Sequence, residues 1–171
     1  QNIDTTWVHS LERQDPINVG NNLTIRQPHH SPVVNRQNIV IAPGEGFGHG
    51  THPTTLLSLS LLEKALQIHE TPRLLDLGTG TGILALSALA WGAHRVWAVD
   101  SDPLAIAAAQ RNALESDLID DVVFAHSEDP LLETFHGCVA NLYLGALTAS
   151  APLLAKVCEP DRKSTRLNSS H

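Results

Sequence analysis

A glycine-rich turn between an apolar segment and a helix is the feature that most restricts the fold of this chain. Residues 76–82 read DLGTGTG; they close a predicted strand at 73–77 and lead into a predicted helix at 81–91. Glycines let the backbone turn tightly and approach a ligand, and the first turn of a helix offers unpaired N–H groups to an anion. The pattern therefore predicts a ligand-binding turn at the end of a buried strand.

Strands and helices alternate on both sides of this turn. Periodicity and turn residues predict strands at residues 39–41, 73–77, 95–100, 122–125 and 137–141. Helices are predicted at residues 53–68, 81–91, 103–115 and 144–156. Helices of roughly 10 to 15 residues between short strands are typical of a parallel sheet with helices on both faces. We therefore expect an α/β, doubly wound, Rossmann-like sheet, with residues 137–141 as its fourth strand, that is truncated after this strand and the following helix.

Three regions of the chain differ in composition. Residues 1–36 are polar and rich in turn residues, and we expect a linker there, with a short hairpin between 17–19 and 23–25. Residues 37–160 carry the alternating pattern and form the predicted main domain. Residues 161–171 read DRKSTRLNSSH, which resembles the in-frame translation of a sequencing-library adapter. We expect this tail to be non-native and disordered, with a natural flexible tail as the alternative.

Charge and hydropathy exclude several classes of protein. The net charge is −7, and residues 161–171 are basic, so the rest of the chain is more acidic still. An acidic chain disfavours a nucleic-acid binder, which needs a clustered basic face, and favours a basic macromolecular partner. No apolar run approaches the roughly 20 residues of a membrane span. Cys138 and Cys158 stand alone in apolar segments, which is typical of reduced thiols in a cytoplasmic protein.

The glycine spacing argues against a dinucleotide site. A nicotinamide fingerprint has the pattern G-x-G-x-x-G, whereas Ile83 holds its last position here. Asp76, just before the glycines, suits a ligand with a positive charge, such as an ammonium or a sulfonium. Asp100 ends the next strand, where a carboxylate can bind two ribose hydroxyls. The alternative is a simple tight turn at 78–82, with Asp100 and Asp102 as helix-capping acids.

Residues 76–106 resemble the nucleoside-binding half of class I S-adenosylmethionine-dependent methyltransferases. The segments PGEGFGHGTHPTT at 43–55 and VANLYLGAL at 139–147 narrow the resemblance to the PrmA family, which methylates protein eleven of the large ribosomal subunit. The likeness covers about residues 7–160. It implies S-adenosyl-L-methionine as cofactor and an N-methyltransferase acting on amines of a basic ribosomal protein. These amines are lysine side chains, the N-terminal α-amine or both.

The resemblance also places the family's cofactor contacts on this sequence, at Thr55, Gly78, Asp100 and Asn141. With the other loop residues, the candidate cofactor-binding set is Thr55, Asp76, Gly78, Gly80, Gly82, Asp100 and Asn141.

The chain departs from the family pattern in three respects. His49 stands where the family usually has threonine, and Gly-Cys at 137–138 replaces the usual Asp-Val. The family's amino-terminal substrate-recognition domain and the last strands of its sheet fall outside this sequence. We therefore expect a fragment of such an enzyme.

Asn141 is the candidate catalytic residue. It ends a strand at the carboxyl edge of the sheet, where open α/β sheets bind ligands. Its amide oxygen can accept a hydrogen bond from an amine and so direct the nitrogen lone pair at a methyl group; the alternative is a simple turn residue. Residues 51–55, preceded by several glycines, are expected to cover the cofactor, with ordinary helix capping as the alternative. The sequence shows no dedicated general base, and none is needed if the amine enters neutral.

The sequence also leaves room for other sites and other functions. The histidines have irregular spacing and no neighbouring cysteine, so we expect no metal site; they are His29, His30, His49 and His52. A small-molecule methyltransferase with the same cofactor half is one alternative function. A cofactor-binding fragment without catalysis is another, because the predicted strand at 137–141 would form an exposed edge of the sheet.

Overall fold

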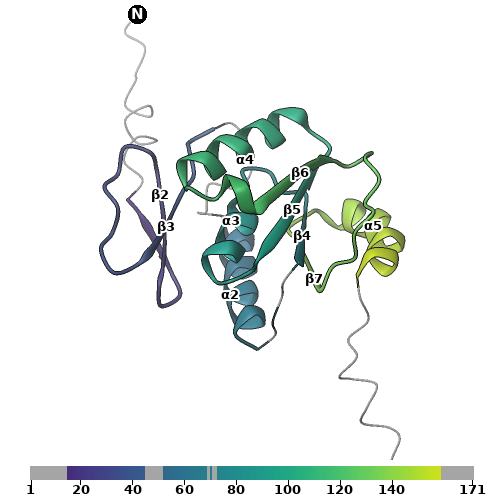
Figure 1. Ribbon diagram of the computed structural model, residues 1–171, viewed down its shortest axis with the longest axis horizontal. Coiled ribbons are helices and arrows are strands. Elements are labelled where there is room, and N and C mark those ends of the chain that lie inside the picture. The colour runs from purple at the N-terminus through teal and green to yellow at the C-terminus, as the bar shows by residue number, and fades with distance from the viewer. Residues whose placement is uncertain (1–14, 45–51, 69, 71–72, 159–171) are drawn as a thin grey trace, which may run out of the picture.

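The main sheet has four strands in the order β6-β5-β4-β7 (Figure 1). This is a computed structural model, and it describes residues 15–44, 52–68, 70 and 73–158. The strands are β4 (Arg73–Leu77), β5 (Arg95–Asp100), β6 (Val122–His126) and β7 (Gly137–Ala140). Every pairing in this sheet is parallel, as predicted. The carboxyl ends of the strands therefore meet at one edge, where β4 with its glycine turn lies between β5 and β7.

The helices also follow the predicted pattern. They are α2 (Pro53–Ile68), α3 (Ile83–Ala90), α4 (Pro103–Glu115) and α5 (Leu144–Val157), with a short 3-10 helix η1 (Ile119–Asp121). The start of α4 is fixed by Asp102, whose carboxylate accepts a hydrogen bond from the N–H of Leu104 at 2.9 Å. Helix α3 begins two residues later than predicted, because Gly82 has a φ of 82°, which a right-handed helix cannot include.

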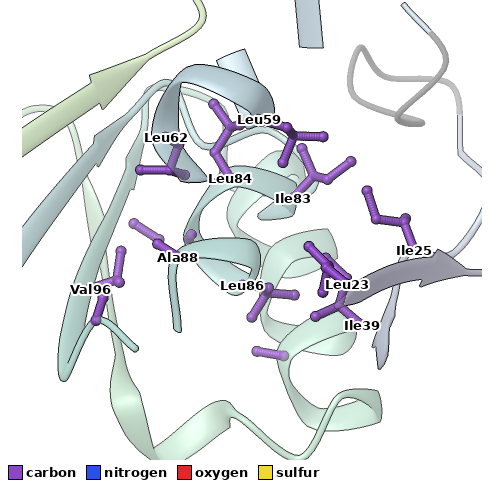
Figure 2. Packing of buried hydrophobic residues seen from close by; sticks show 14 of the residues in the cluster. Leu23, Ile25, Ile39, Leu59, Leu62, Ile83, Leu84, Leu86, Ala88 and Val96 are labelled. Carbon is purple, nitrogen blue, oxygen red and sulfur yellow. The ribbon is translucent and has the colours of Figure 1, made fainter. Parts of the chain in front are cut away.

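Helices pack on both faces of the main sheet, which confirms the doubly wound architecture. On one face α3 and α4 pack against the strands, and α2 packs against α3. Leu59, Leu86 and Val96 belong to the core cluster on this side (Figure 2). On the other face α5 contributes Val157 to a smaller cluster that includes Leu75. Neighbouring residues of one strand enter opposite clusters, because side chains alternate between the faces of a sheet.

A second, smaller sheet contains β1 (Ile17–Val19), β2 (Leu23–Arg26) and β3 (Gln37–Val40). Strands β1 and β2 form the predicted antiparallel hairpin, and β3 pairs with β2 in parallel. Leu23, Ile25 and Ile39 from this sheet join the core beside α3 (Figure 2). The predicted boundary between residues 36 and 37 therefore falls within one sheet, and the hairpin packs on the unit that follows it.

Strand β7 is the outer strand of the main sheet on the side of α5, as predicted (Figure 1). Directly after α5, Cys158 forms a parallel bridge with Phe135, which precedes β7. After α5, the chain therefore comes back to the edge of β7 that faces away from β4.

Some predictions lie outside the described residues. They concern the tail at 161–171 and the two residues His49 and Thr51 of the glycine-rich segment. In the described part of the chain, none of the helices combines the length and the apolar character that crossing a membrane requires.

Candidate functional site

The glycine loop, residues 78–82, is held against the end of β5 by backbone hydrogen bonds. The N–H groups of Gly78 and Thr79 both donate to the carbonyl of Val99, at 2.8 and 3.0 Å. Gly78, Gly80 and Gly82 have φ values of 73°, 56° and 82°. These left-handed conformations are open to glycine at little cost and strained for other residues, so the glycine spacing follows from the path of the loop.

Two glycines of the loop also lie close to neighbouring side chains. A Cβ at Gly78 would overlap the end of the Leu142 side chain, and a Cβ at Gly82 would lie 3.1 Å from Cβ of Ala109, a tight contact. Leu142 follows the candidate residue Asn141, so the loop packs directly against the segment after β7. Helix α4 approaches the other end of the loop through Ala109.

Asp76 supports the glycine loop from within the protein. Its side chain is fully buried, and Oδ2 accepts hydrogen bonds from the Thr79 hydroxyl at 2.7 Å and from the N–H of Ala85 at 3.1 Å. Among the described residues its other oxygen, Oδ1, has no hydrogen-bond partner. Burial raises the pKa of Asp76 from 3.8 to about 7, against the two hydrogen bonds, which lower it. Its expected contact with a cationic ligand stays a prediction.

The pKa of Asp76 predicts a pH-dependent stability. Between its ordinary value of 3.8 and about 7, the folded protein holds a proton that the unfolded chain releases. The free energy of unfolding therefore falls as the pH rises through this window, by at most about 1.4 kcal/mol per pH unit. The variant Asp76→Asn cannot titrate and will lose this part of the slope. Urea unfolding at several pH values measures it, and Asp102→Asn, the same change at an exposed cap, is the control. An unchanged slope in Asp76→Asn would refute the assignment.

Asp100 joins the glycine loop to the start of α4. Its Oδ2 accepts a hydrogen bond from the N–H of Gly80 at 2.9 Å, and its Oδ1 accepts one from the N–H of Asp102 at 3.0 Å. Each carboxylate oxygen has a second acceptor position, so both remain able to accept a hydroxyl proton. The structural role expected of Asp100 is therefore present, since its half-buried carboxylate fixes the turn at the carboxyl edge of the sheet. Its binding of ribose hydroxyls stays a prediction.

Thr55 and Asn141, which are 86 residues apart, meet at this edge. The side-chain amide of Asn141 donates to the Thr55 hydroxyl at 3.3 Å. Thr55 is buried in the first turn of α2, whereas Asn141 follows β7 and is exposed. The two residues were predicted from separate segments, and the fold places them in direct contact beside Leu142.

Two supporting residues were not predicted from the sequence. Thr79 binds Asp76, and Asn112 on α4 is buried and binds the backbone of the glycine loop. The sequence does contain a clue to the role of Asn112. It is a polar residue on the apolar side of α4, between Ala109 and Ala113, which are both buried. A buried amide needs hydrogen-bond partners, and this requirement marks such a position for attention.

Both cysteines are free thiols, and each is half-buried. Burial raises the pKa of Cys138 to about 12, so this thiol stays protonated. The His52 ring nitrogen Nδ1 lies 2.7 Å from the Thr54 hydroxyl, at the start of α2. In the part of the chain that the structure describes, no three metal-binding side chains lie close enough to share an ion.

Comparison with known proteins identifies the family of this chain. The family model described as ribosomal protein L11 methyltransferase (PrmA) matches residues 1–165. The chain belongs to the PrmA family. The L11 methyltransferase of Heliobacterium modesticaldum is 35% identical over 161 residues, which cover 91% of this chain and 50% of that protein. The chain thus spans about half the length of the curated relatives it matches.

Solved structures agree with the fold. The crystal structure of the ribosomal protein L11 methylase from Lactobacillus delbrueckii matches with a TM-score of 0.74 and 28% identity, and covers 85% of this chain and 76% of that one. An O-methyltransferase from Bacillus cereus, solved in complex with SAH, matches with a TM-score of 0.54 and 18% identity over 64% of this chain and 54% of that one. The second likeness concerns the fold alone.

Proposed function

We propose that this PrmA-family chain binds S-adenosyl-L-methionine at the carboxyl edge of the main sheet and serves methyl transfer to amines of a ribosomal protein. One observation carries the proposal: the candidate groups form a continuous set of contacts. The glycine loop binds Asp100 through Gly80 and packs against Leu142, and the neighbouring Asn141 binds Thr55. Groups from four segments of the chain therefore converge on one edge, where open α/β sheets bind ligands.

The residues of this edge fit the nucleoside half of such a cofactor. The Asp100 carboxylate has free acceptor positions for ribose hydroxyls, and the backbone turn at Gly78 brings main-chain atoms close to a ligand. When bound, the cofactor would supply a methyl group on a sulfonium centre. Asp76, buried behind the loop, would contribute by holding the loop in place through Thr79.

Asn141 would orient the acceptor amine. Its Nδ2 donates to Thr55, which leaves Oδ1 directed away from that bond and able to accept a hydrogen from the amine. A lysine amine has an ordinary pKa of about 10.4, so it must lose its proton before its lone pair can react. Removal from water favours the neutral form, and an acceptor at Oδ1 then holds the amine in one orientation.

The acidic character of the chain supports a basic protein as substrate. The sequence has 18 Asp and Glu against 11 Lys and Arg. A surplus of negative charge accelerates encounters with a basic partner and makes them sensitive to salt. Ribosomal proteins of the L11 type named by the relatives would meet the enzyme in the cytoplasm.

The variant Asn141→Ala tests this role. We expect methyl transfer from labelled S-adenosylmethionine to purified L11 to fall about a hundredfold or more, because orientation of the amine is lost. Binding of S-adenosylhomocysteine, measured by calorimetry, should change only a few-fold, since the loop and Asp100 remain. Asn21→Ala, in the exposed hairpin turn, is the matched control.

Three outcomes would contradict parts of the proposal. Equal transfer by Asn141→Ala and the parent would remove Asn141 from the reaction. Transfer to small amines but not to L11 would favour a small-molecule methyltransferase. A parent chain that binds S-adenosylhomocysteine and transfers nothing would be a cofactor-binding fragment.

A further inference from the structure

A single buried amide connects the glycine loop to a distant segment of the chain. Asn112 lies on α4 and is only 2% exposed. Its Nδ2 donates to the carbonyl of Thr81 at 2.8 Å, and its Oδ1 accepts from the N–H of Ala42 at 3.0 Å. Both partners are backbone groups, 31 and 70 residues away in the sequence.

One partner lies in the glycine loop, and the other lies directly after β3. Thr81 stands inside the glycine loop, between Gly80 and Gly82. Ala42 follows β3 and begins the connection to α2, whose first turn carries Thr55. A donor and an acceptor at fixed spacing are needed to bind a carbonyl on one side and an N–H on the other, and a side-chain amide provides both.

The neighbouring turns of α4 continue the same contact surface. One turn before Asn112, Ala109 packs against Gly82. One turn after it, the Ser116 hydroxyl accepts a hydrogen bond from the N–H of Val40 at 2.8 Å. This face of α4 therefore touches the glycine loop at its middle and β3 at its end, and only Asn112 binds both segments through hydrogen bonds among the described contacts of the helix.

We propose that Asn112 is a positioning residue for the cofactor. It holds the glycine loop in the position in which Gly80 can bind the Asp100 carboxylate. The helix that carries Asn112 begins directly after Asp100, whose carboxylate binds Gly80. The loop is thus held from Asp100 on one side and from Asn112, at Thr81, on the other. This inference rests on the proposed cofactor site and adds a residue that neither contacts the amine nor lies at the carboxyl edge.

The variant Asn112→Asp separates the two hydrogen bonds. The change keeps an oxygen for Ala42 but places an acceptor against the carbonyl of Thr81, so the bond to the loop is lost. Ser116→Ala is the matched control, because it weakens the docking of the same helix on β3 without touching the loop. Asn112→Ser is the second variant in case the aspartate prevents folding, since its short side chain cannot span both partners.

Two measurements on the 171-residue chain decide the proposal. The first is the affinity for S-adenosylhomocysteine, measured by calorimetry. The Asn112 variants are compared with Ser116→Ala under conditions in which both have lost the same amount of thermal stability. We expect about a tenfold or larger loss of affinity for the Asn112 variants and a change within about twofold for Ser116→Ala. The second is amide hydrogen exchange of the ligand-free protein, where Gly80 and Gly82 should exchange faster in the Asn112 variants alone.

Equal affinity and equal exchange in the Asn112 variants and the parent would overturn the proposal. So would a loss of affinity in Ser116→Ala as large as that in the Asn112 variants, because the effect would then come from helix docking. If the parent itself binds no S-adenosylhomocysteine, the proposed function fails, and the exchange of Gly80 and Gly82 still decides whether Asn112 positions the loop.

Discussion

Replacing Asp100 with alanine will weaken the binding of S-adenosylhomocysteine by about a hundredfold or more. Each hydrogen bond to a charged group contributes about 1.5–3 kcal/mol, and the ribose hydroxyls would lose two of them. The same change leaves the N–H of Gly80 without its present acceptor, so the glycine loop is also loosened. Calorimetric titration of the parent and the variant measures the effect.

Asp102→Ser is the control for this prediction. It removes a negative charge two residues away but keeps a side chain that can accept the hydrogen bond from Leu104 at the start of α4. We expect its affinity to stay within a few-fold of the parent. An Asp100→Ala variant that binds as tightly as the parent would exclude Asp100 from the cofactor site.

Replacing Gly78 with alanine will affect both stability and binding. The left-handed φ of 73° costs an alanine about 1–2 kcal/mol, and its Cβ would overlap Leu142 in the present packing. The overlapping atoms are the end of the flexible, half-buried Leu142 side chain, which must turn away. We expect the free energy of unfolding to fall by about 1–3 kcal/mol. The affinity for S-adenosylhomocysteine should fall by at least about tenfold, because the contact between the loop and Leu142 changes.

Gly92→Ala separates strain from packing. Gly92 has a φ of 105°, and a Cβ built there has no heavy atom of the described residues within 4 Å. This variant should lose stability through its backbone conformation and keep its affinity. The double variant Gly78→Ala, Leu142→Ala should recover part of the loss in binding. An affinity of Gly78→Ala equal to that of Gly92→Ala would contradict a close contact between the loop and Leu142.

The order and type of the secondary structure could be read from the sequence because local patterns determine them. Alternating apolar runs, the Asp102-Pro103 helix start and the glycine turn predicted β4, β5, α4 and the parallel sheet. The role of β3 could not be read in this way. Its apolar residues fit either sheet, and its pairing with β2 depends on contacts between segments rather than on its own pattern.

In the candidate site, the contact between neighbouring elements could be predicted from the sequence, and the contacts of Asn112 with distant segments could not. Asp100 and the glycine loop stand close in sequence on consecutive elements, and their hydrogen bond follows from that order. The contact of Thr55 with Asn141 agrees with the family resemblance, which assigns both residues to one site. Asn112 was missed because its partners lie on other segments, and only the folded chain brings them within hydrogen-bond distance.

The most direct test of the cofactor site is a calorimetric comparison of S-adenosylhomocysteine with NAD on the parent chain. A G-x-G-x-G loop with a carboxylate at the end of the next strand should bind the sulfur nucleoside in a saturable titration, and NAD should give no specific heat of binding. Preference for NAD, or no binding of either ligand, would contradict the account.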